Sequence, residues 1–448
     1  MTLRMTHLMV WDGADRVIED ATIDLQDGHV RWLGPTSEAP PPAAGADVQD
    51  ARGKLALPGL VNAHTHLYSS LARGMAVSPF EPSSFTQILE QLWWRLDKAL
   101  DPASVRASAQ IGAMEAARCG VTTLIDHHAS PNAIPGSLDA VGDAVVEELG
   151  LRGAFCYELS DRDGIGKRDE GIAENVRFLS RPGSDRSAGL FGLHASFTVS
   201  DATLEQVANA IPDDVGIHIH VAEGPEDEVQ CVQSHGIRIA HRLDRFGLLR
   251  PRSILAHCLH IDDEEKALLA ERDVIVVHNP RSNMNNGVGR FDLDGFLGRG
   301  IVTGLGTDGL GANMLAELFT AGILQKHAAG DPLKGGFDQL YALLFAHNPT
   351  IARRLLGVDV GRIAVGGPAD IILLDYTPPT TLDANTVLGH LLFGAAVHTV
   401  RVTDSFVAGR PVLRDGVFVD IDEEAVYAHA REQASALWRR LDSGVIPS

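Results

Sequence analysis

The sequence predicts an α/β protein: a (β/α)8 TIM barrel with a small β-sandwich domain that both ends of the chain build. Between residues 57 and 359, short apolar runs alternate with longer segments of helical periodicity, as in a parallel sheet covered by helices. Before and after that region, short strand-like runs are separated by turns. We therefore expect residues 1–56 and 360–420 to form the sandwich, residues 57–359 the barrel, and residues 421–448 a C-terminal helix.

Eight apolar runs predict the strands of the barrel. They are the run that ends at His66, then Val121–Ile125, Arg152–Tyr157, Leu190–Leu193, Gly216–His220, Ser253–Ala256, Val274–Val277 and Val302–Gly306. Segments with helical patterns, such as Pro102–Cys119 and Asp262–Glu271, separate them. This number of strand and helix units favours a closed barrel over an open sheet.

Both ends of the chain have the character of a β domain. Thr22–Gln26 and His29–Gly34 flank the turn Asp27-Gly28, which predicts a hairpin. Ala369–Asp375 and Phe406–Leu413 are strand-like runs near the other end. We expect the two ends to meet in one small domain beside the barrel.

Composition limits the classes of function. The 448 residues are 45% hydrophobic and 22% charged, as in a globular protein. The net charge is −21, from 38 basic and 59 acidic residues. So acidic a chain repels phosphate backbones, and no long run of Lys and Arg offsets this, which argues against a nucleic-acid partner.

Cysteine usage and hydropathy indicate the cellular setting. Four cysteines occur without a C-x-x-C spacing (Cys119, Cys156, Cys231 and Cys258), so we expect neither a disulfide framework nor a structural zinc knuckle. The N-terminus lacks the apolar core of a signal peptide, and no apolar stretch has the roughly 18 residues that a membrane span needs. We expect a cytoplasmic protein without membrane contact.

The first apolar run ends in two histidines that can share a metal ion. Functional groups of parallel barrels lie at the C-terminal ends of the strands. His64 and His66 are two residues apart, so on a strand they point to the same face. Taken alone, such a pair is more often two solvated loop histidines than two ligands.

Later runs end in further metal-binding residue types. The fifth run supplies His218 and His220, with Glu223 three residues later, and the sixth and eighth runs are followed by His257 and Asp308. Each residue alone is more often a packing or loop residue. Together, imidazoles and a carboxylate suit zinc or ferrous iron with one position open for water, whose pKa the metal lowers from about 15.7 to about 7.

Two other runs end in histidines with less certain roles. His194 ends the fourth run, and Asp126, His127 and His128 end the second. For these residues, packing or loop solvation and substrate contact remain equally open.

These motifs together resemble those of the amidohydrolase superfamily. The matching stretches are Pro58–His66, His220–Glu223, His257 and Gly306–Gly309, in the family's order and over nearly the whole chain. Within the superfamily, the chain resembles the branch of triazine hydrolases and heterocycle deaminases, which includes 8-oxoguanine deaminase and S-adenosylhomocysteine deaminase. Three stretches resemble the SsnA-type aminohydrolases in particular: Leu92–Asp97, Ile125–Pro131 and Val277–Asn286.

The resemblance implies a site with one divalent metal ion, Zn²⁺ in the first place and Fe²⁺ as the alternative. The implied ligands are His64, His66, His220 and Asp308. His257 would lie beside the water that the metal activates, and His218 would stand behind the ligands. Binuclear relatives bridge two metals with a modified Lys at the fourth strand, but here no Lys lies near His194.

The resemblance also implies hydrolytic deamination of an aminated purine-like or related N-heterocycle. Glu223 would protonate a ring nitrogen, Asp308 would move the proton of the attacking water to the leaving ammonia, and His257 would stabilise the attacking oxygen. Candidates for substrate contact are His127, His128, His194, Arg281 and Asn283. The implied partners are a small heterocyclic substrate and further copies of the chain, in a dimer or larger homo-oligomer.

Other functions remain compatible with the same residues. The branch also hydrolyses other C–N and C–halogen bonds, as in triazine dechlorination, and its relatives open cyclic amides. A metal-binding protein without catalysis, or a purine-binding protein without turnover, would belong to another class. A panel of heterocyclic substrates in an ammonia assay separates these hypotheses.

Overall fold

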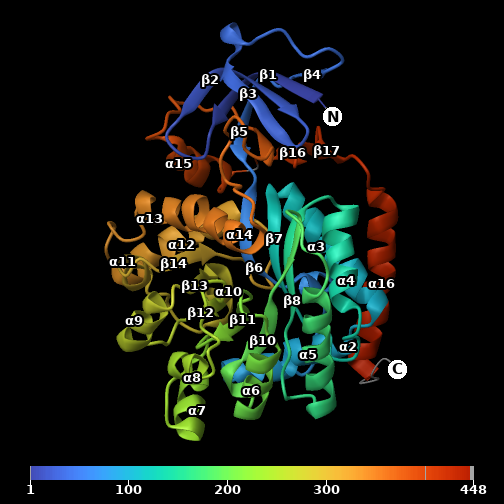
Figure 1. Cartoon of the computed structure of the whole chain (residues 1–448), viewed down its shortest axis with the longest axis vertical. Helices are drawn as coiled ribbons and strands as arrows, with labels where there is room; N and C mark the ends of the chain where they lie inside the picture. Colours follow the sequence, from blue (N-terminus) through green and yellow to red (C-terminus); the bar gives the residue numbers. More distant parts are fainter. Residues whose placement is uncertain (1, 399, 444–448) are drawn as a thin grey trace.

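A computed structural model describes residues 2–398 and 400–443 of the chain. It has two parts (Figure 1): a β domain built from both chain ends, and a larger body of parallel strands and helices. The predicted C-terminal helix is α16, Glu423–Ser443, while residues 444–448 of that prediction lie outside the described residues.

The larger body contains two parallel sheets. The first consists of β6 (Leu60–Thr65), β7 (Val121–His128), β8 (Arg152–Tyr157) and β9 (Ser187–Gly189). The second consists of β10 (Phe191–Ala195), β11 (Ile217–Val221), β12 (Ile254–His257), β13 (Ile275–His278) and β14 (Val302–Leu305). Nearly all residues of these strands are buried, which explains why they form continuous apolar runs in the sequence.

The two parallel sheets adjoin at both of their edges. Only Leu190 separates β9 from β10, and the fourth predicted run, Leu190–Leu193, begins at this residue and continues into β10. An isolated parallel bridge joins Leu159 to Leu193 at this seam, and another joins Thr65 to Asp308 at the seam between β6 and β14. The α/β class is therefore confirmed, with the predicted strands in the predicted order.

A buried asparagine fastens each seam. The side chain of Asn348, from a helix, donates to the carbonyls of Val61 (2.7 Å) and Leu305 (2.9 Å), which belong to β6 and β14. Asn175 donates to the carbonyls of Tyr157 (2.8 Å) in β8 and Gly192 (3.4 Å) in β10. These bonds join the adjoining edges of the two sheets.

Helices surround the parallel strands (Figure 1). Those before β11 are α1 (Phe85–Ile88), η3 (Leu89–Trp93), α2 (Trp94–Ala99), α3 (Pro102–Arg118), α4 (Ser137–Gly142), η4 (Asp143–Glu148), α5 (Ile165–Leu179) and α6 (Asp201–Ala210), with the short η1 (Thr36–Glu38), η2 (Leu67–Ala72) and η5 (Ser196–Thr198). Those after it are α7 (Pro225–His235), α8 (Ile239–Arg245), α9 (Asp263–Glu271), α10 (Pro280–Asn286), α11 (Leu293–Gly298), α12 (Met314–Ala329), α13 (Phe337–Tyr341), η6 (Ala342–His347), α14 (Asn348–Leu356), α15 (Val387–Gly389) and η7 (His390–Ala395). Capping boxes at Asp101 and Asp262 explain where α3 and α9 begin.

The β domain is joined by hydrogen bonds into one mostly antiparallel sheet. In the described residues it has nine strands: β1 (Thr2–Trp11), β2 (Val17–Gln26), β3 (His29–Pro35), β4 (Asp47–Asp50), β5 (Lys54–Pro58), β15 (Ile371–Asp375), β16 (Val402–Val407), β17 (Arg410–Arg414) and β18 (Val417–Phe418). The predicted hairpin across Asp27-Gly28 is confirmed. β5 pairs with both β1 and β15, so the chain ends meet as expected, while the division into two packed sheets stays a prediction.

A buried ion pair anchors the β domain to the parallel strands. Arg152, the first residue of β8, donates to Asp370, which directly precedes β15, through Nε (2.7 Å) and Nη2 (2.9 Å). Both side chains are only 1% exposed. The β domain therefore sits at the N-terminal ends of the strands, and their C-terminal ends lie on the far side of the body.

Helix α16 lies along the outside of α3 (Figure 1). Trp438 of this helix donates from Nε1 to the carbonyl of Leu71 (2.9 Å), and Arg440 donates from Nε to the carbonyl of Ala99 (2.7 Å). The helix thereby supports η2 and α2, two segments near the C-terminal ends of the strands.

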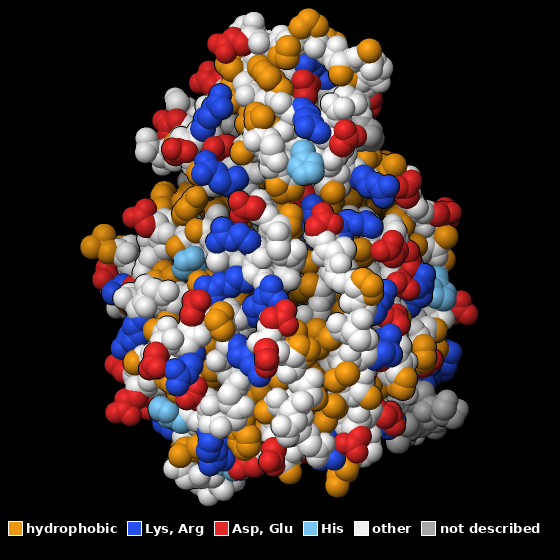
Figure 2. Space-filling view, in the orientation of Figure 1, with side chains coloured by type: hydrophobic (Ala, Val, Ile, Leu, Met, Phe, Trp, Pro, Cys, Tyr) orange, Lys and Arg blue, Asp and Glu red, His pale blue; other side chains and the backbone are white. Residues whose placement is uncertain are grey.

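The surface carries mixed charge. On the face that Figure 2 shows, Lys and Arg side chains are interspersed with Asp and Glu, without a continuous basic area. Among the described residues, no helix is long and apolar enough to cross a membrane.

Candidate active site

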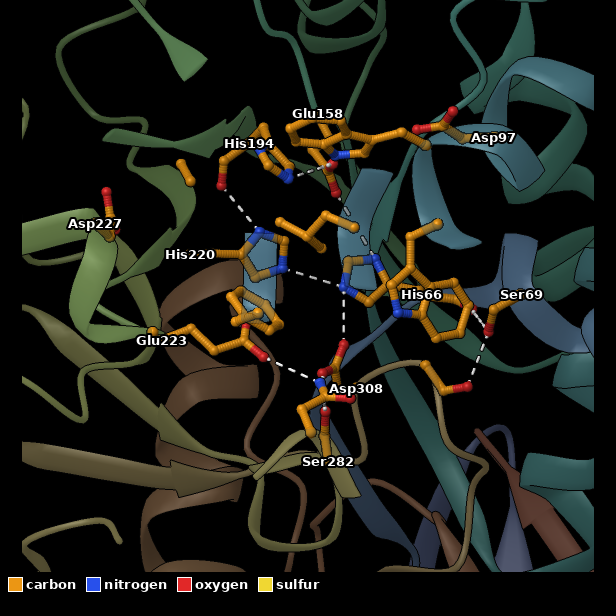
Figure 3. Close-up of a pocket in the computed structure, with 18 of the residues that line it drawn as sticks. His66, Ser69, Asp97, Glu158, His194, His220, Glu223, Asp227, Ser282 and Asp308 are labelled. Atoms are coloured by element: carbon orange, nitrogen blue, oxygen red, sulfur yellow. Dashed lines mark hydrogen bonds and ion pairs between the residues drawn. The ribbon is translucent and has the colours of Figure 1, made fainter. Parts of the chain in front are cut away.

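Histidine and aspartate side chains from four strands converge at the C-terminal ends of the parallel sheets. His64 and His66 come from the end of β6, His220 from β11, His257 from the end of β12, and Asp308 from just after β14. The close-up in Figure 3 shows His66, His220 and Asp308 pointing toward one another.

Gly306 permits the close approach of β14 to β6 that brings Asp308 into this group. A Cβ atom at this position would lie 2.8 Å from the carbonyl oxygen of His64 and 2.5 Å from Asn279 Oδ1. Without it, the N–H groups of Thr307 and Asp308 both reach the carbonyl of His64, each at 3.0 Å. The Gly-Thr-Asp sequence therefore aims the Asp308 carboxylate at the histidines.

The distances between the converging atoms match those between ligands of one metal ion. His66 Nε2 lies 3.1 Å from His220 Nε2 and 3.0 Å from Asp308 Oδ1, and His64 Nε2 lies 3.6 Å from Asp308 Oδ1. Ligand atoms about 2.0–2.1 Å from a tetrahedral zinc ion are about 3.3 Å apart. His64 Nε2 is also buried without a hydrogen-bond partner among the described residues. These residues fit a metal ion.

Hydrogen bonds from the far side of the rings fix which nitrogens face the centre. His66 Nδ1 lies 2.6 Å from the carbonyl of His127, and His220 Nδ1 lies 2.9 Å from the carbonyl of His194. A carbonyl only accepts, so each Nδ1 carries the proton and each Nε2 presents a lone pair. In the metal-free protein, burial alone would lower the pKa of His66, but Asp308 raises it to about 9.

His218 supports His64 from behind. Its Nε2 lies 2.9 Å from His64 Nδ1, and its Nδ1 lies 3.7 Å from the sulfur of Cys156. When His64 Nδ1 donates to His218, the lone pair of His64 Nε2 points at the metal position. The ring of His127 stacks on His218 with centroids 4.3 Å apart, which fixes the plane of the supporting ring.

A second group of polar side chains lies beside the proposed ligands. His257 donates from Nδ1 to Asn283 Oδ1 (2.8 Å), so its bare Nε2 faces Glu223 Oε2 at 3.3 Å and Asp308 Oδ2 at 3.9 Å. Asn286 donates to Glu223 Oε1 at 3.3 Å. Burial, together with the charge of Asp308, raises the pKa of Glu223 well above its usual range. Glu223 is thus suited to carry a proton at neutral pH.

Backbone strain is concentrated where these strands end. Ala222, His257 and Asp308 have φ angles of 47°, 73° and 53°, a region that residues other than glycine rarely adopt. Such conformations persist where the surrounding structure fixes them, and they cluster at functional sites. Here they turn the chain at the ends of β11, β12 and β14, beside the metal position.

A cavity with about 750 Å³ of open space adjoins the metal position. His66, His220, Glu223 and Asp308 line its inner end. Its other walls carry Phe85, Leu89, Trp93, Trp94, Asp97, Glu158, Arg162, His194, Phe197, Asp227, Ser282 and Asn286, among others. Cavities with aromatic walls and a few convergent polar groups are typical of small-molecule sites.

The five predicted substrate-contact residues differ in their position relative to the cavity. His194 lines the cavity. His127 lies behind the ligands, and His128 is buried with its Nε2 2.8 Å from Ser130 Oγ. Asn283 supports His257, and Arg281 is paired with Glu317 at 3.6 Å with 41% of its side chain exposed. Apart from His194, therefore, none of the five belongs to the cavity wall.

Several cavity residues received no role from the sequence, although Trp94, Asp97 and Ser282 lie in the matching stretches Leu92–Asp97 and Val277–Asn286. Glu158 directly follows β8, so the rule of strand ends could have found it. Ser282 donates to Asp308 Oδ2, and Trp94 and Asp97 come from α2, in the long connection between β6 and β7. Trp94 stands over His194 with ring centroids 6.0 Å apart. No spacing signal marks residues of such a connection.

Comparison with known proteins gives consistent matches over the whole chain. The model of the amidohydrolase family matches residues 55–412. The 5′-deoxyadenosine deaminase of Methanothermobacter thermautotrophicus is 34% identical, over 87% of this chain and 89% of its own. The 5-methylthioadenosine/S-adenosylhomocysteine deaminase of Desulforudis audaxviator is 31% identical, over 93% of this chain and 94% of its own.

A solved structure is also similar. An adenosine deaminase from Xanthomonas campestris with bound zinc superposes with a TM-score of 0.83 and 27% sequence identity, over 97% of this chain and 98% of its own. This similarity implies a TIM-barrel fold with an additional domain, in agreement with the two adjoining parallel sheets.

Proposed function

The chain belongs to the amidohydrolase family, and from that premise we propose that it removes the ring amine from purine nucleosides altered at the 5′ carbon. The chain is a metal-dependent hydrolase that acts on carbon–nitrogen bonds. The observation that carries the proposal is the convergence of bare His Nε2 atoms and a carboxylate beside the buried acid Glu223.

The proposed ligands are His64, His66, His220 and Asp308, with zinc as the proposed metal. A bound zinc ion supplies a water molecule that is acidic enough to act as a nucleophile at neutral pH. The support for these ligands is geometric: His66 Nε2 lies 3.1 Å from His220 Nε2 and 3.0 Å from Asp308 Oδ1, and His64, His220 and Asp308 belong to one group, with His257, whose ligand atoms lie within 4.8 Å of one another.

The two carboxylate oxygens of Asp308 face different partners. Oδ1 faces the Nε2 atoms of His64 and His66, while Oδ2 faces His257 and accepts a hydrogen bond from Ser282. We assign Oδ1 to the metal and Oδ2 to the proton of the attacking water. His257, with its Nδ1–H held by Asn283, keeps Nε2 bare to accept a hydrogen bond from that water.

Glu223 is assigned as the acid that protonates the ring nitrogen next to the amine. Its carboxyl is buried, its pKa is raised, and it lies on the cavity wall beside His257. Protonation there prevents negative charge from accumulating on the ring as its carbon becomes tetrahedral. A proton transfer of this kind contributes roughly 10²–10⁴-fold to the rate.

Release of ammonia from zinc-loaded protein tests the proposed function. The substrates are 5′-deoxyadenosine, 5-methylthioadenosine and adenosine, and conversion of the adenine ring to hypoxanthine is followed in parallel by its ultraviolet spectrum. We expect ammonia and the nucleoside of hypoxanthine in equal amounts. A zinc-loaded protein that releases no ammonia from 5′-deoxyadenosine or 5-methylthioadenosine would refute the proposed substrate class, whatever its activity on adenosine.

A further inference from the structure

The carboxylate of Glu158 stands on the cavity wall without a hydrogen bond from any described side chain. Its side chain is 3% exposed, and its Oε2 is buried without a partner. The nearest nitrogens are His127 Nδ1 at 3.7 Å and His66 Nδ1 at 3.9 Å from Oε2, and His194 Nε2 at 3.7 Å from Oε1. All three distances exceed that of a hydrogen bond.

Two of these nitrogens have no N–H available for Glu158, and the third, His127 Nδ1, is too far away at 3.7 Å. The Nδ1–H of His66 is already given to the carbonyl of His127, at 2.6 Å. The Thr198 hydroxyl donates to the carbonyl of Ala195 at 3.1 Å, so it accepts a hydrogen bond from His194 Nδ1, 2.7 Å away. The proton of the neutral His194 ring is therefore on Nδ1, and Nε2, which faces Glu158, has none to donate. A buried carboxylate without a donor is costly, so its partner must come from a molecule in the cavity.

Most of the charged side chains on the cavity wall are acidic. Asp97, Glu158, Glu223, Asp227 and Asp308 line it, and Arg162 is the one Lys or Arg side chain among its described residues. Arg162 is bound by two carboxylates: Nη2 pairs with Asp97, and Nε donates to Asp163 at 3.0 Å, while Nη1 is buried without a hydrogen-bond partner among the described residues. Its guanidinium also lies over the ring of Trp94, 5.1 Å from the centroid.

Glu158 lies across the metal position from Glu223. Figure 3 shows Glu158, His194 and Asp97 on one side of the His66–His220 pair, and Glu223 and Ser282 on the other. If Glu223 contacts the ring nitrogen beside the reacting carbon, the rest of the substrate extends away from Glu223. That part of the substrate meets Glu158, Trp94 and Arg162.

We propose that Glu158 is a specificity residue that accepts a hydrogen bond from an N–H, O–H or ammonium group of the substrate, and that this wall excludes substituents bearing a carboxylate. The inference rests on the proposed function and narrows its substrate class to nucleosides with an uncharged or cationic substituent. A carboxylate there would face Glu158 and Asp97, and Asp97 and Asp163 offset the charge of Arg162, so the wall stays net acidic although Nη1 of Arg162 has no partner among the described residues.

Three adenine nucleosides that differ at the 5′ position test this inference. They are 5′-deoxyadenosine (neutral), 5′-amino-5′-deoxyadenosine (cationic) and adenosine-5′-carboxylate (anionic). The zinc-loaded wild type is expected to show a kcat/KM at least tenfold lower for adenosine-5′-carboxylate than for 5′-deoxyadenosine. Assays at mildly alkaline pH keep the Glu158 carboxylate ionised.

Glu158→Gln keeps the shape of the side chain and removes its charge. Because a hydrogen bond to a charged group contributes about 1.5–3 kcal/mol, the preference for the cationic over the neutral nucleoside should fall roughly 10- to 150-fold. Asp97→Asn, which releases one partner of Arg162, should raise the relative kcat/KM for adenosine-5′-carboxylate. Glu170→Gln, an exposed change on α5 outside the cavity wall, is the matched control and should change neither ratio.

Binding measurements separate the two proposals. Calorimetric dissociation constants for the three nucleosides, measured with zinc-loaded Glu223→Gln and with the double variant Glu223→Gln/Glu158→Gln, do not depend on turnover. Absence of deamination with the expected order of affinities would overturn the proposed function alone. Equal affinities for the cationic and anionic nucleosides, or an order of affinities that Glu158→Gln leaves unchanged, would overturn the role of Glu158.

Discussion

Replacement of Asn283 by Ala distinguishes a residue that positions His257 from one that contacts the substrate. Asn283 Oδ1 accepts the Nδ1–H of His257 at 2.8 Å, and both side chains are fully buried. Alanine leaves that N–H without a partner, which costs about 1–3 kcal/mol. If the cost falls on the orientation of His257 in the transition state, kcat should drop roughly 5- to 150-fold.

A comparison of kcat and KM for two substrates tests this prediction. A positioning residue lowers kcat by the same factor for 5′-deoxyadenosine and 5-methylthioadenosine and leaves KM nearly unchanged. Asn209→Ala, an exposed change on α6, is the control for the same substitution. A KM that rises by different factors for the two substrates, with kcat preserved, would refute the reasoning and restore Asn283 as a substrate contact.

Three further predictions concern stability and metal binding. Asp370→Ala leaves Arg152 buried without its bidentate partner and should lower the free energy of unfolding by about 3–5 kcal/mol. Asp185→Ala, the control, removes a partner of Arg152 that is 65% exposed and should lower it by at most about 1 kcal/mol. Equal losses for the two variants in denaturant titrations would contradict the importance of the buried pair. Below pH 9 the metal-free His66 holds a proton that zinc must displace, so zinc affinity should rise with pH up to about 9 and level off above it. A zinc affinity that calorimetric titrations find independent of pH between 7 and 9 would contradict this competition between zinc and the proton. Zinc at about 100 times its dissociation constant should add about 2.7 kcal/mol to the free energy of unfolding, and a chelator should remove that gain in thermal melts.

The strand ends were predictable because their signals are local. The apolar runs predict where β6, β11, β12 and β14 lie and where each one ends. Because alternate residues of a strand point to the same face, His64 and His66 were expected on one face. His257 and Asp308 followed because the rule for parallel barrels applies to any polar residue directly after such a run. The same rule applied to β8 would have found Glu158.

The residues of α10 show why the rest was not predictable. The stretch Val277–Asn286 was recognised, but which of its side chains point inward depends on where the helix begins and on its rotation. The structure turns Ser282 toward Asp308, Asn283 toward His257 and Asn286 toward Glu223, while Arg281 points to Glu317. A helix turns by about 100° per residue, so an error of one position selects a different face.

Two features of the fold also lay beyond local signals. β7 continues to His128, three residues past the predicted run, so His127 stacks on His218 rather than lining the cavity. The strands of the two chain ends pair through β5 and β15 into one sheet, a long-range choice that alternation within each strand does not determine.

The most direct test of the proposed mechanism compares wild type with Glu223→Gln, each with its bound metal measured. We expect one zinc ion per chain in both proteins, rapid release of ammonia from 5′-deoxyadenosine by wild type, and release roughly 10²–10⁴-fold slower by Glu223→Gln. Equal metal content and equal rates in the two proteins would contradict the assignment of Glu223 as the acid on which this deaminase depends.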